Sequence, residues 1–235
     1  PATDWIEDPV LRTAGADVYD RWARGEWSWQ TPEIETAFRE FRELVIDSER
    51  SFGGLRAVAQ TEVAEAGGPL FTDDPGCAMY KQASFATDWF PSGTGIATDG
   101  DVDFFVLPSE QAEETALVTA GDAAIAFTDR PDVERFMAFL ATADGGRAWA
   151  SEGGFVSQRV DVDIDSFYND TDAEVAELFR SETTSRFDAS DTLPADVGSA
   201  LLWEQLTNWI SGSSTLDEVL AALDEALDLS DSDTG

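Results

Sequence analysis

Hydrophobic residues recur at helical spacing in residues 32–47. Apolar side chains return there every three or four positions, which is the period of a helix with one buried face. Thr31 is a suitable N-cap for such a helix, and Pro32 fits its first turn. The apolar positions are Ile34, Ala37, Phe38, Phe41, Leu44 and Val45. The pattern therefore predicts a helix that packs on a core.

The same period appears in two further ranges, residues 216–228 and residues 132–142. Thr215 and Glu218 form a capping-box pair at the start of the first of these ranges. The apolar stripes are Leu216, Val219, Leu220, Leu223 and Leu227 in one range, and Val133, Phe136, Met137 and Leu140 in the other. Both ranges are predicted to be helices.

Shorter apolar runs bounded by turn residues predict strands. One run covers residues 102–107, and a second covers residues 116–127, where Gly121-Asp122 interrupts it. Helices interleaved with short strands favour an α/β fold. The polar residues 229–235 at the end of the chain are expected to be disordered.

The chain is strongly acidic. Of its 235 residues, 48 are Asp or Glu and 14 are Lys or Arg, which gives a formal net charge of −34. Such a charge repels nucleic-acid phosphates and anionic lipid headgroups, so it argues against both partners. The sequence has no histidine, which excludes Ser-His-Asp and Cys-His catalysis and His-ligated metals. A single cysteine, Cys77, excludes an internal disulfide.

This acidity predicts a response to salt. Carboxylate repulsion is strongest at low ionic strength, where screening is weakest. The melting temperature is therefore expected to rise as NaCl is raised from a low to a molar concentration. A melting temperature that does not rise with salt would contradict an adaptation to solubility or elevated salt.

No targeting segment is visible. The apolar runs fall far short of the roughly 18 residues that a membrane-spanning helix needs, and no signal peptide opens the chain. Residues 1–5 read like the middle of a domain. We therefore expect the sequence to be a processed or truncated piece of a longer protein.

No catalytic constellation stands out. Asp161, Asp163 and Asp165 have the spacing of calcium ligands, but Ser166 stands where the calcium loop needs glycine and Asp172 where it needs glutamate. A solvated acidic loop is the better interpretation. Paired carboxylates are common in a chain this acidic, so they alone do not indicate a glycosidase.

The aromatic residues are more informative. Sugars present flat C–H faces and a rim of hydroxyls, which suit aromatic platforms combined with Asp, Glu or Arg. The chain is rich in both, although most tryptophans of a globular protein belong to its core. The eight tryptophans are Trp5, Trp22, Trp27, Trp29, Trp89, Trp149, Trp203 and Trp209.

Several segments resemble the extracellular (family 1) solute-binding proteins of carbohydrate ABC transporters, most closely the α-glucoside-binding branch. The segments occur in the family's order along nearly the whole chain. They are residues 1–5 with Glu7-Asp8, residues 11–15, residues 74–79 with residues 82–85, Asp129-Arg130-Pro131, Trp149-Ala150 with residues 153–157, and residues 186–191 with Leu193-Pro194.

The resemblance implies a periplasmic-binding-protein-like (type II) α/β fold, mainly the C-lobe with a short N-lobe segment. Residues 1–116 would form the first part of the C-lobe, and residues 117–155 would form the crossing strand and a helix of the N-lobe. Residues 156–228 would form the closing helices of the C-lobe. Full-length members are nearly twice as long, so most of the N-lobe, the signal peptide and the lipid-anchor cysteine would be absent.

The family's activity implies a non-enzymatic, monomeric sugar receptor that needs no cofactor or metal. It would lie in the periplasm or on the outer face of the cytoplasmic membrane, and it would close its lobes on an α-glucoside-type di- or oligosaccharide. It would then deliver this sugar to membrane permease subunits. Two alternatives stay open, namely a glycoside hydrolase with paired carboxylates and a structural acidic surface domain.

The family's binding positions map onto Trp5, Phe85, Gly121, Asp122, Arg186, Asp188 and Trp203. The aromatics among them would stack on sugar rings, with core packing as the alternative for Trp5 and an edge-of-core position as the alternative for Trp203. The Gly121-Asp122 pair matches a glycine turn at the lobe crossing, where Asp122 would either accept sugar hydroxyls or be solvated. Arg186 would donate to hydroxyls, and Asp188 would orient Arg186, bind sugar or form a surface ion pair.

Overall fold

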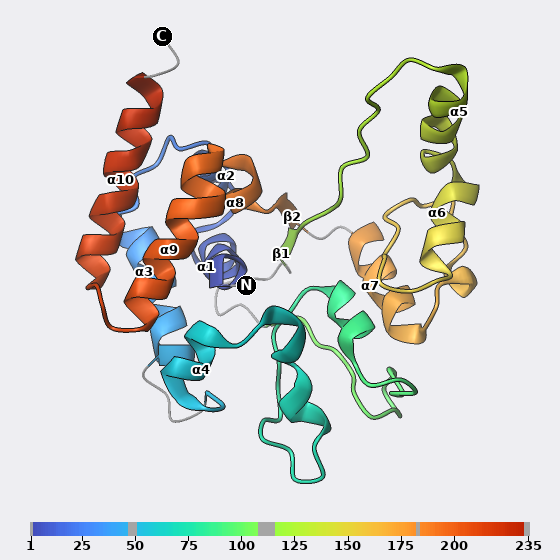
Figure 1. The fold of residues 1–235 in the computed structure, drawn as a ribbon, viewed down its shortest axis with the longest axis horizontal. Helices are drawn as coiled ribbons and strands as arrows, with labels where there is room; N and C mark the ends of the chain where they lie inside the picture. The colour runs from blue at the N-terminus through green and yellow to red at the C-terminus, as the bar shows by residue number, and fades with distance from the viewer. Residues whose placement is uncertain (1, 47–50, 108–115, 182–183, 233–235) are drawn as a thin grey trace. The chain divides into compact units, whose positions relative to one another are not determined.

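The computed structural model describes residues 2–46, 51–107, 116–181 and 184–232 (Figure 1). The chain divides into two compact units. The first unit comprises Pro1–Val63, Pro108–Ala120 and Thr184–Gly235, and the second comprises Ala64–Leu107 and Gly121–Thr183. Residues 64–107 thus group with residues 121–183, whereas the sequence analysis keeps residues 1–116 together. The assignment of ranges to receptor lobes stays a prediction.

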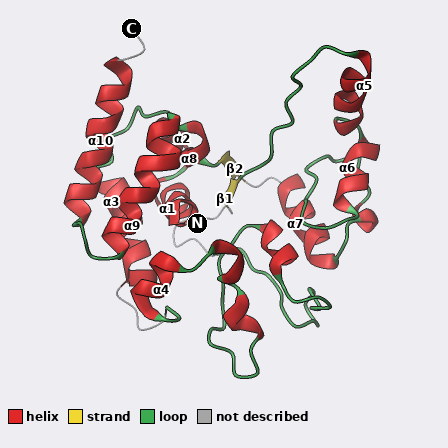
Figure 2. Cartoon of the chain, viewed as in Figure 1, coloured by secondary structure: helices red, strands yellow, loops and turns green. Residues whose placement is uncertain are grey.

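Helices build most of the first unit (Figure 2). They are α1 (Ala2–Pro9), α2 (Ala16–Ala23), α3 (Pro32–Phe41), α4 (Gly54–Gln60), α8 (Ala189–Thr192), α9 (Leu202–Ile210) and α10 (Leu216–Ser232). The π-helical turns Val10–Ala14, Arg42–Ile46 and Asp196–Leu201 adjoin α1, α3 and α9.

The helices predicted over residues 32–47 and 216–228 are confirmed, the first of them through residue 46, since residue 47 lies outside the described residues. Pro32 starts α3, although the Thr31 side chain does not cap it; its hydroxyl instead donates to the Ser28 carbonyl oxygen. At α10, the Glu218 carboxylate accepts the Thr215 N–H at 2.9 Å and the Thr215 hydroxyl accepts the Glu218 N–H at 3.3 Å, so the capping box forms as predicted. The α10 backbone stays helical through residue 232, so residues 229–232 depart from the predicted disorder of residues 229–235, and residues 233–235 lie outside the described residues.

The described residues hold one two-stranded parallel sheet, formed by β1 (Ala116–Thr119) and β2 (Thr184–Phe187) with Ala116 opposite Thr184. A small parallel sheet among helices agrees with the α/β class. The predicted strands are longer than those observed, because residues 120–127 are not in a strand and residues 102–107 contribute only Val102, in an isolated bridge with Ile96. A strand needs a neighbour for its backbone N–H and C=O groups, and these segments pair with no other described strand.

Aromatic side chains fill the core of the first unit. The Trp22 and Trp29 rings meet edge to face with centroids 4.8 Å apart, and Trp29 continues to Phe38 at 6.3 Å. Trp209 of α9 contacts Phe38 and Phe41 of α3. The predicted stripe of α10 joins this core from the other side through Val219, Leu220, Leu223 and Leu227. This packing joins the first 46 residues to the last helices of the chain.

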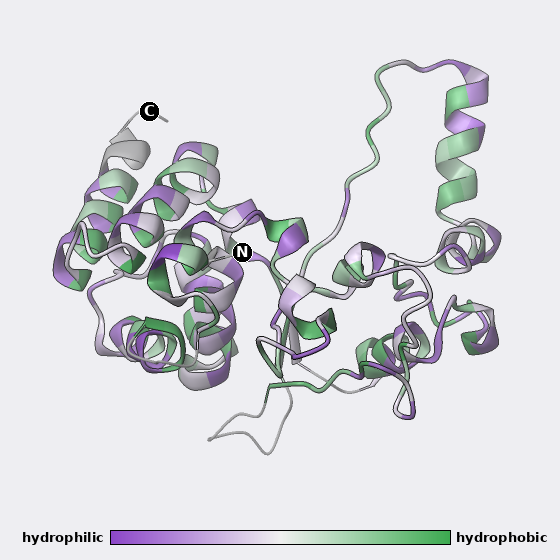
Figure 3. Cartoon of the chain, turned by 60° about the horizontal axis from the view of Figure 1, so that its bottom comes forward, coloured by the Kyte–Doolittle hydropathy of each residue, from purple (hydrophilic) through white to green (hydrophobic). Residues whose placement is uncertain are grey.

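The second unit has a much smaller core. Its helices are α5 (Pro131–Leu140), α6 (Ala143–Ala150) and α7 (Asp170–Arg180), with 3-10 turns over Gly68–Phe71, Ser84–Trp89 and Ile164–Ser166. The buried hydrophobic residues of its core cluster are Ala150, Val162, Phe167 and Ala176. The predicted helix over residues 132–142 is confirmed as α5, but none of its residues is buried although it carries several hydrophobic side chains (Figure 3).

Candidate functional site

Trp5 lies on α1 and packs against the core of the first unit. Its ring meets the Phe41 ring edge to face at 5.9 Å, and the side chain is partly buried. This contact favours the core alternative for Trp5, and a role at a ligand stays a prediction.

Trp203 differs from Trp5 because its side chain faces solvent. The residue is 54% exposed on α9, whereas Leu202 and Leu206 on the same helix are fully buried. The predicted position at the flank of the buried stripe is therefore confirmed. A large flat aromatic ring exposed on a rigid helix is available for stacking.

Arg186 lies in β2, and its guanidinium Nε donates to the Asp20 carboxylate of α2. Nη1 of the same guanidinium donates to the Ser185 carbonyl oxygen at 2.9 Å. About a third of each side chain in the Arg186–Asp20 pair is exposed. The pair therefore holds the guanidinium in a fixed orientation that is still open to solvent.

Asp188 is buried and caps the short helix α8. Its carboxylate accepts the Asp191 N–H at 3.2 Å and the Ser190 hydroxyl at 2.7 Å. Its own N–H donates to the Thr119 carbonyl oxygen of β1 at 2.8 Å. The ion pair of Arg186 is with Asp20, so the expectation that Asp188 orients this guanidinium is corrected: the cap directs the Asp188 carboxylate toward the α8 backbone.

A second buried carboxyl binds the backbone that connects β2 to α8. Glu7 of α1 is fully buried, and its carboxyl accepts the Ala189 N–H at 2.9 Å and the Ser190 N–H at 3.1 Å. Burial, with a smaller contribution from the neighbouring Asp188, raises the pKa of Glu7 to about 8.

Tyr19 of α2 completes this cluster. Its hydroxyl donates to the Phe187 carbonyl oxygen at 2.9 Å and accepts the Ala189 N–H at 3.1 Å. Burial, together with the Glu7 and Asp188 carboxyls, raises the pKa of Tyr19. Neither Glu7 nor Tyr19 is among the binding positions that the family resemblance implies, although together they bind the backbone on either side of Asp188. No local pattern separates Glu7 from Asp8, the acidic residue next to it.

The remaining predicted site residues belong to the second unit. Phe85 lies in the turn Ser84–Trp89, where its half-exposed ring meets the Trp89 ring edge to face at 5.2 Å. Gly121 and Asp122 are exposed and lie outside any helix, strand or turn, so the predicted glycine turn does not form. A Cβ at Gly121 would meet no atom within 4 Å, which means that packing does not require glycine there.

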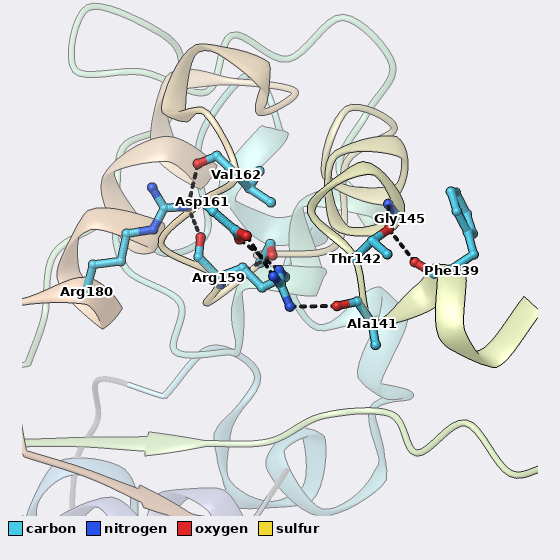
Figure 4. Close-up of polar contacts among 9 residues, drawn as sticks. Phe139, Ala141, Thr142, Gly145, Arg159, Asp161, Val162 and Arg180 are labelled. Carbon is cyan, nitrogen blue, oxygen red and sulfur yellow. Dashed lines mark hydrogen bonds and ion pairs between the residues drawn. The ribbon is translucent and has the colours of Figure 1, made fainter.

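Of the three aspartates with calcium-like spacing, Asp161 and Asp163 have protein partners for their side chains, and Figure 4 shows those of Asp161. The Asp161 carboxylate binds the Arg159 guanidinium at 2.8 and 2.7 Å, and Arg159 also donates to the Ala141 carbonyl oxygen at 2.6 Å. Asp163 accepts the Asp165 N–H at 3.2 Å. Among the described residues, no three His, Cys, Asp or Glu side chains gather as a metal site requires.

Asp172 is a buried carboxyl at the start of α7. It accepts the Asn169 side-chain amide at 3.0 Å, and burial with the nearby Asp88 raises its pKa to about 6. Gly154 lies beside Asp88 with φ of +67°, and a Cβ there would come within 2.0 Å of the Asp88 carboxylate. The glycine is therefore required by close packing within the second unit.

None of the described helices is both long and apolar enough to span a membrane. The described site candidates fall into two sets, with Trp5, Arg186, Asp188 and Trp203 on the first unit and the others on the second. Within the first unit, α1, which carries Trp5, packs against α8, which Asp188 caps, and against α9, which carries Trp203. Arg186 lies in β2, which packs against α2 and β1.

Two known binding proteins align with almost the whole chain. It is 32% identical over 230 residues to the α-glucosides-binding periplasmic protein AglE of Rhizobium meliloti, which covers 97% of this chain and 50% of the relative. It is 30% identical over 212 residues to the osmoprotective compounds-binding protein GgtB of Synechocystis, which covers 90% of this chain and 50% of the relative. The chain thus spans about half the length of the relatives it matches. No family model and no solved structure matches it.

Proposed function

Because the chain belongs to the solute-binding proteins of ABC importers, as its alignments to two of them show, we propose that it forms part of a receptor for an α-glucoside-type di- or oligosaccharide. The alignment to an α-glucosides-binding protein over 97% of the chain carries this proposal. We further propose the type II binding-protein fold, with residues 1–116 and 156–228 mainly in the C-lobe and residues 117–155 in the N-lobe.

The first unit supplies side chains suited to this ligand. Trp203 offers an exposed ring for stacking on a pyranose face. Arg186, oriented by Asp20, offers N–H donors for sugar hydroxyls. Phe85 of the proposed C-lobe range would add a second ring, and Asp122 of the proposed N-lobe range would accept hydrogen bonds from sugar hydroxyls when the lobes close. Asp188, through its cap of α8, and Trp5, through its packing on Phe41, would hold the surrounding helices in place.

The proposal also accounts for the unpaired faces of the second unit. Phe136 of α5 is 58% exposed, and residues 102–107 and 120–127 pair with no other described strand. Apolar helix faces normally pack on another element. We propose that the part of the receptor corresponding to the unmatched half of the relatives covers them.

We also propose that the receptor is a monomer and that it delivers its solute to a membrane permease. It would lie in the periplasm or at the outer face of the cytoplasmic membrane. The proposal describes binding without chemistry, in line with relatives that are named for binding. Release of the chromophore from a chromogenic α-glucoside by the purified protein would instead support the hydrolase alternative.

The test is calorimetric titration of the full-length receptor that the proposal requires. The panel contains sucrose, maltose, trehalose and larger α-glucosides. Small osmoprotective solutes are added, because one relative is named for binding such compounds. Micromolar or tighter binding of an α-glucoside is expected. Binding confined to the osmoprotective compounds would keep the receptor and change its ligand, while no heat with any α-glucoside contradicts the proposed specificity.

Two substitutions test the site. In the same receptor, Trp203→Ala and Arg186→Ala are each expected to weaken sugar binding about tenfold or more, since each removes a stacking surface or a charged donor. Melting curves should show that both variants remain folded. Trp149→Ala is the matched control, because Trp149 is also half-exposed but stacks on Phe155 of the second unit at 4.5 Å. Unchanged affinity in both site variants would remove these two residues from the site.

A further inference from the structure

The connection from β2 to α8 is held by side chains from the opposite end of the sequence. This connection, residues 187–190, follows Arg186 directly and contains Asp188. Glu7 of α1 and Tyr19 of α2 together bind the Phe187 carbonyl oxygen and the N–H groups of Ala189 and Ser190. A buried carboxyl that accepts two consecutive N–H groups fixes the path of the backbone between them.

We propose that Glu7 is the positioning residue of this connection and thereby sets the orientation of Asp188 and the backbone position of the adjoining Arg186 at the solute site. The inference rests on the proposed function for the identity of the site, but its structural part concerns the first unit alone. Glu7 does not touch the solute in this proposal, since its side chain is fully buried.

The surroundings of Glu7 make this role dependent on its charge. The groups that face it are the Asp188 carboxyl from the α8 cap and the Tyr19 hydroxyl from α2. Asp191 lies near Asp188, and Asp4 lies near Asp191. None of these groups carries a positive charge. A neutral Glu7 carboxyl adds no second negative charge beside the Asp188 carboxyl.

Ionisation of Glu7 would place two negative charges side by side in a buried setting. The hydrogen bonds that the Ala189 and Ser190 N–H groups donate to Glu7 would then become charge-assisted and stronger. The Glu7 carboxylate would at the same time repel the Asp188 carboxylate from its capping position on α8. The buried carboxyl is expected to ionise near pH 8. Above this pH the connection, and with it Asp188 and Arg186, would change position.

The first arm of the test needs no solute. In the 235-residue chain, NMR titration from pH 6 to pH 9.5 should shift the Ala189 and Ser190 amide protons downfield with a shared midpoint near 8. The Arg186 Nε resonance should follow with the same midpoint. Glu7→Gln, which is neutral at every pH, should abolish all three transitions. Absence of the transitions in the native chain, or their persistence in Glu7→Gln, would overturn the proposal.

A matched control separates positioning from general destabilisation. Asp224 of α10 also accepts a backbone N–H, that of Trp29 at 2.7 Å, together with the side chains of Ser28 and Gln30. Asp224→Asn should leave the three transitions unchanged. If Glu7→Gln does not fold, the carboxyl carbon resonance of Glu7 in the native chain decides the question: its midpoint must coincide with those of Ala189, Ser190 and Arg186, and a different midpoint overturns the proposal.

The second arm uses the full-length receptor and the sugar identified by calorimetry. Affinity for this uncharged ligand should fall at least about threefold between pH 7 and pH 9 in the native receptor, as expected for the loss of one well-placed hydrogen bond. Affinity should be independent of pH in Glu7→Gln. A pH-independent native affinity with intact NMR transitions would overturn the link to the site. If no sugar binds at all, the proposed function fails, while the first arm still decides the role of Glu7.

Discussion

Replacing Trp22 with alanine is expected to lower the free energy of unfolding by about 3–5 kcal/mol, the range typical of a buried large aromatic side chain. Trp22 is fully buried and contacts the rings of both Tyr19 and Trp29, at 5.7 and 4.8 Å. Its removal would leave a cavity beside the Tyr19 and Trp29 rings, which could fill it only in part. Urea unfolding followed by tryptophan-independent far-UV circular dichroism measures the loss.

Two companion variants make this prediction specific. The Trp22 indole N–H is buried and has no hydrogen-bond partner among the described residues. Trp22→Phe removes this unsatisfied donor together with part of the ring, so it should cost much less than Trp22→Ala. Trp203→Ala should change stability by no more than about 0.5 kcal/mol, because the side chain is exposed. Equal losses in the two alanine variants would contradict the assigned core.

Replacing Arg12 with methionine is expected to be comparably severe, at about 3–5 kcal/mol. The Arg12 guanidinium is nearly fully buried, and it donates to Asp8 at 3.0 Å and to Glu40 at 2.6 Å. Methionine would preserve much of the packing but would leave two carboxylates close together without their cation. In a chain with a net charge of −34, no surplus of positive charge is at hand to replace it.

Arg39→Met is the matched control for this prediction. Arg39 also pairs with a glutamate, Glu35, one helical turn away on α3, but its side chain is 61% exposed. Surface pairs of this kind contribute about 0.3–0.5 kcal/mol. Chemical unfolding of both variants in the same buffer should therefore separate them by several-fold. If the two losses were similar, the ion pairs of Arg12 would contribute no more than a surface pair.

The residues that carry the family resemblance include several that hold the first unit together. Glu7, Arg12 and Asp188 all lie in segments that the sequence analysis recognised, and all three are buried. Sequence alone indicated a relationship through them but not their roles. A resemblance identifies positions, whereas hydrogen-bond partners depend on how the chain folds back on itself: Glu7 binds the backbone of Ala189, which lies 182 positions away.

Local patterns predicted the helices well and the strands poorly. Residues 215–228 and 32–47 each carry an apolar stripe, and residues 215–218 form a capping box. These features depend on residues close together in the chain, so the local sequence suffices to predict the helices. A strand is stable only beside another strand. Residues 102–107 have an apolar run without such a neighbour among the described residues, so the run forms no regular strand there.

The sequence by itself determined the helical periodicity and the acidity, because these depend on composition and on residues close together in the chain. It also determined the relationship to solute-binding proteins, because that relationship rests on matching segments in the same order. Only the tertiary structure decided that Arg186 pairs with Asp20, that Asp188 caps α8, and that Glu7 is buried beneath this connection. These contacts join residues far apart in the chain. Their energies depend on distance, burial and the local density of charge, which exist only once α1, α2 and β2 have packed together.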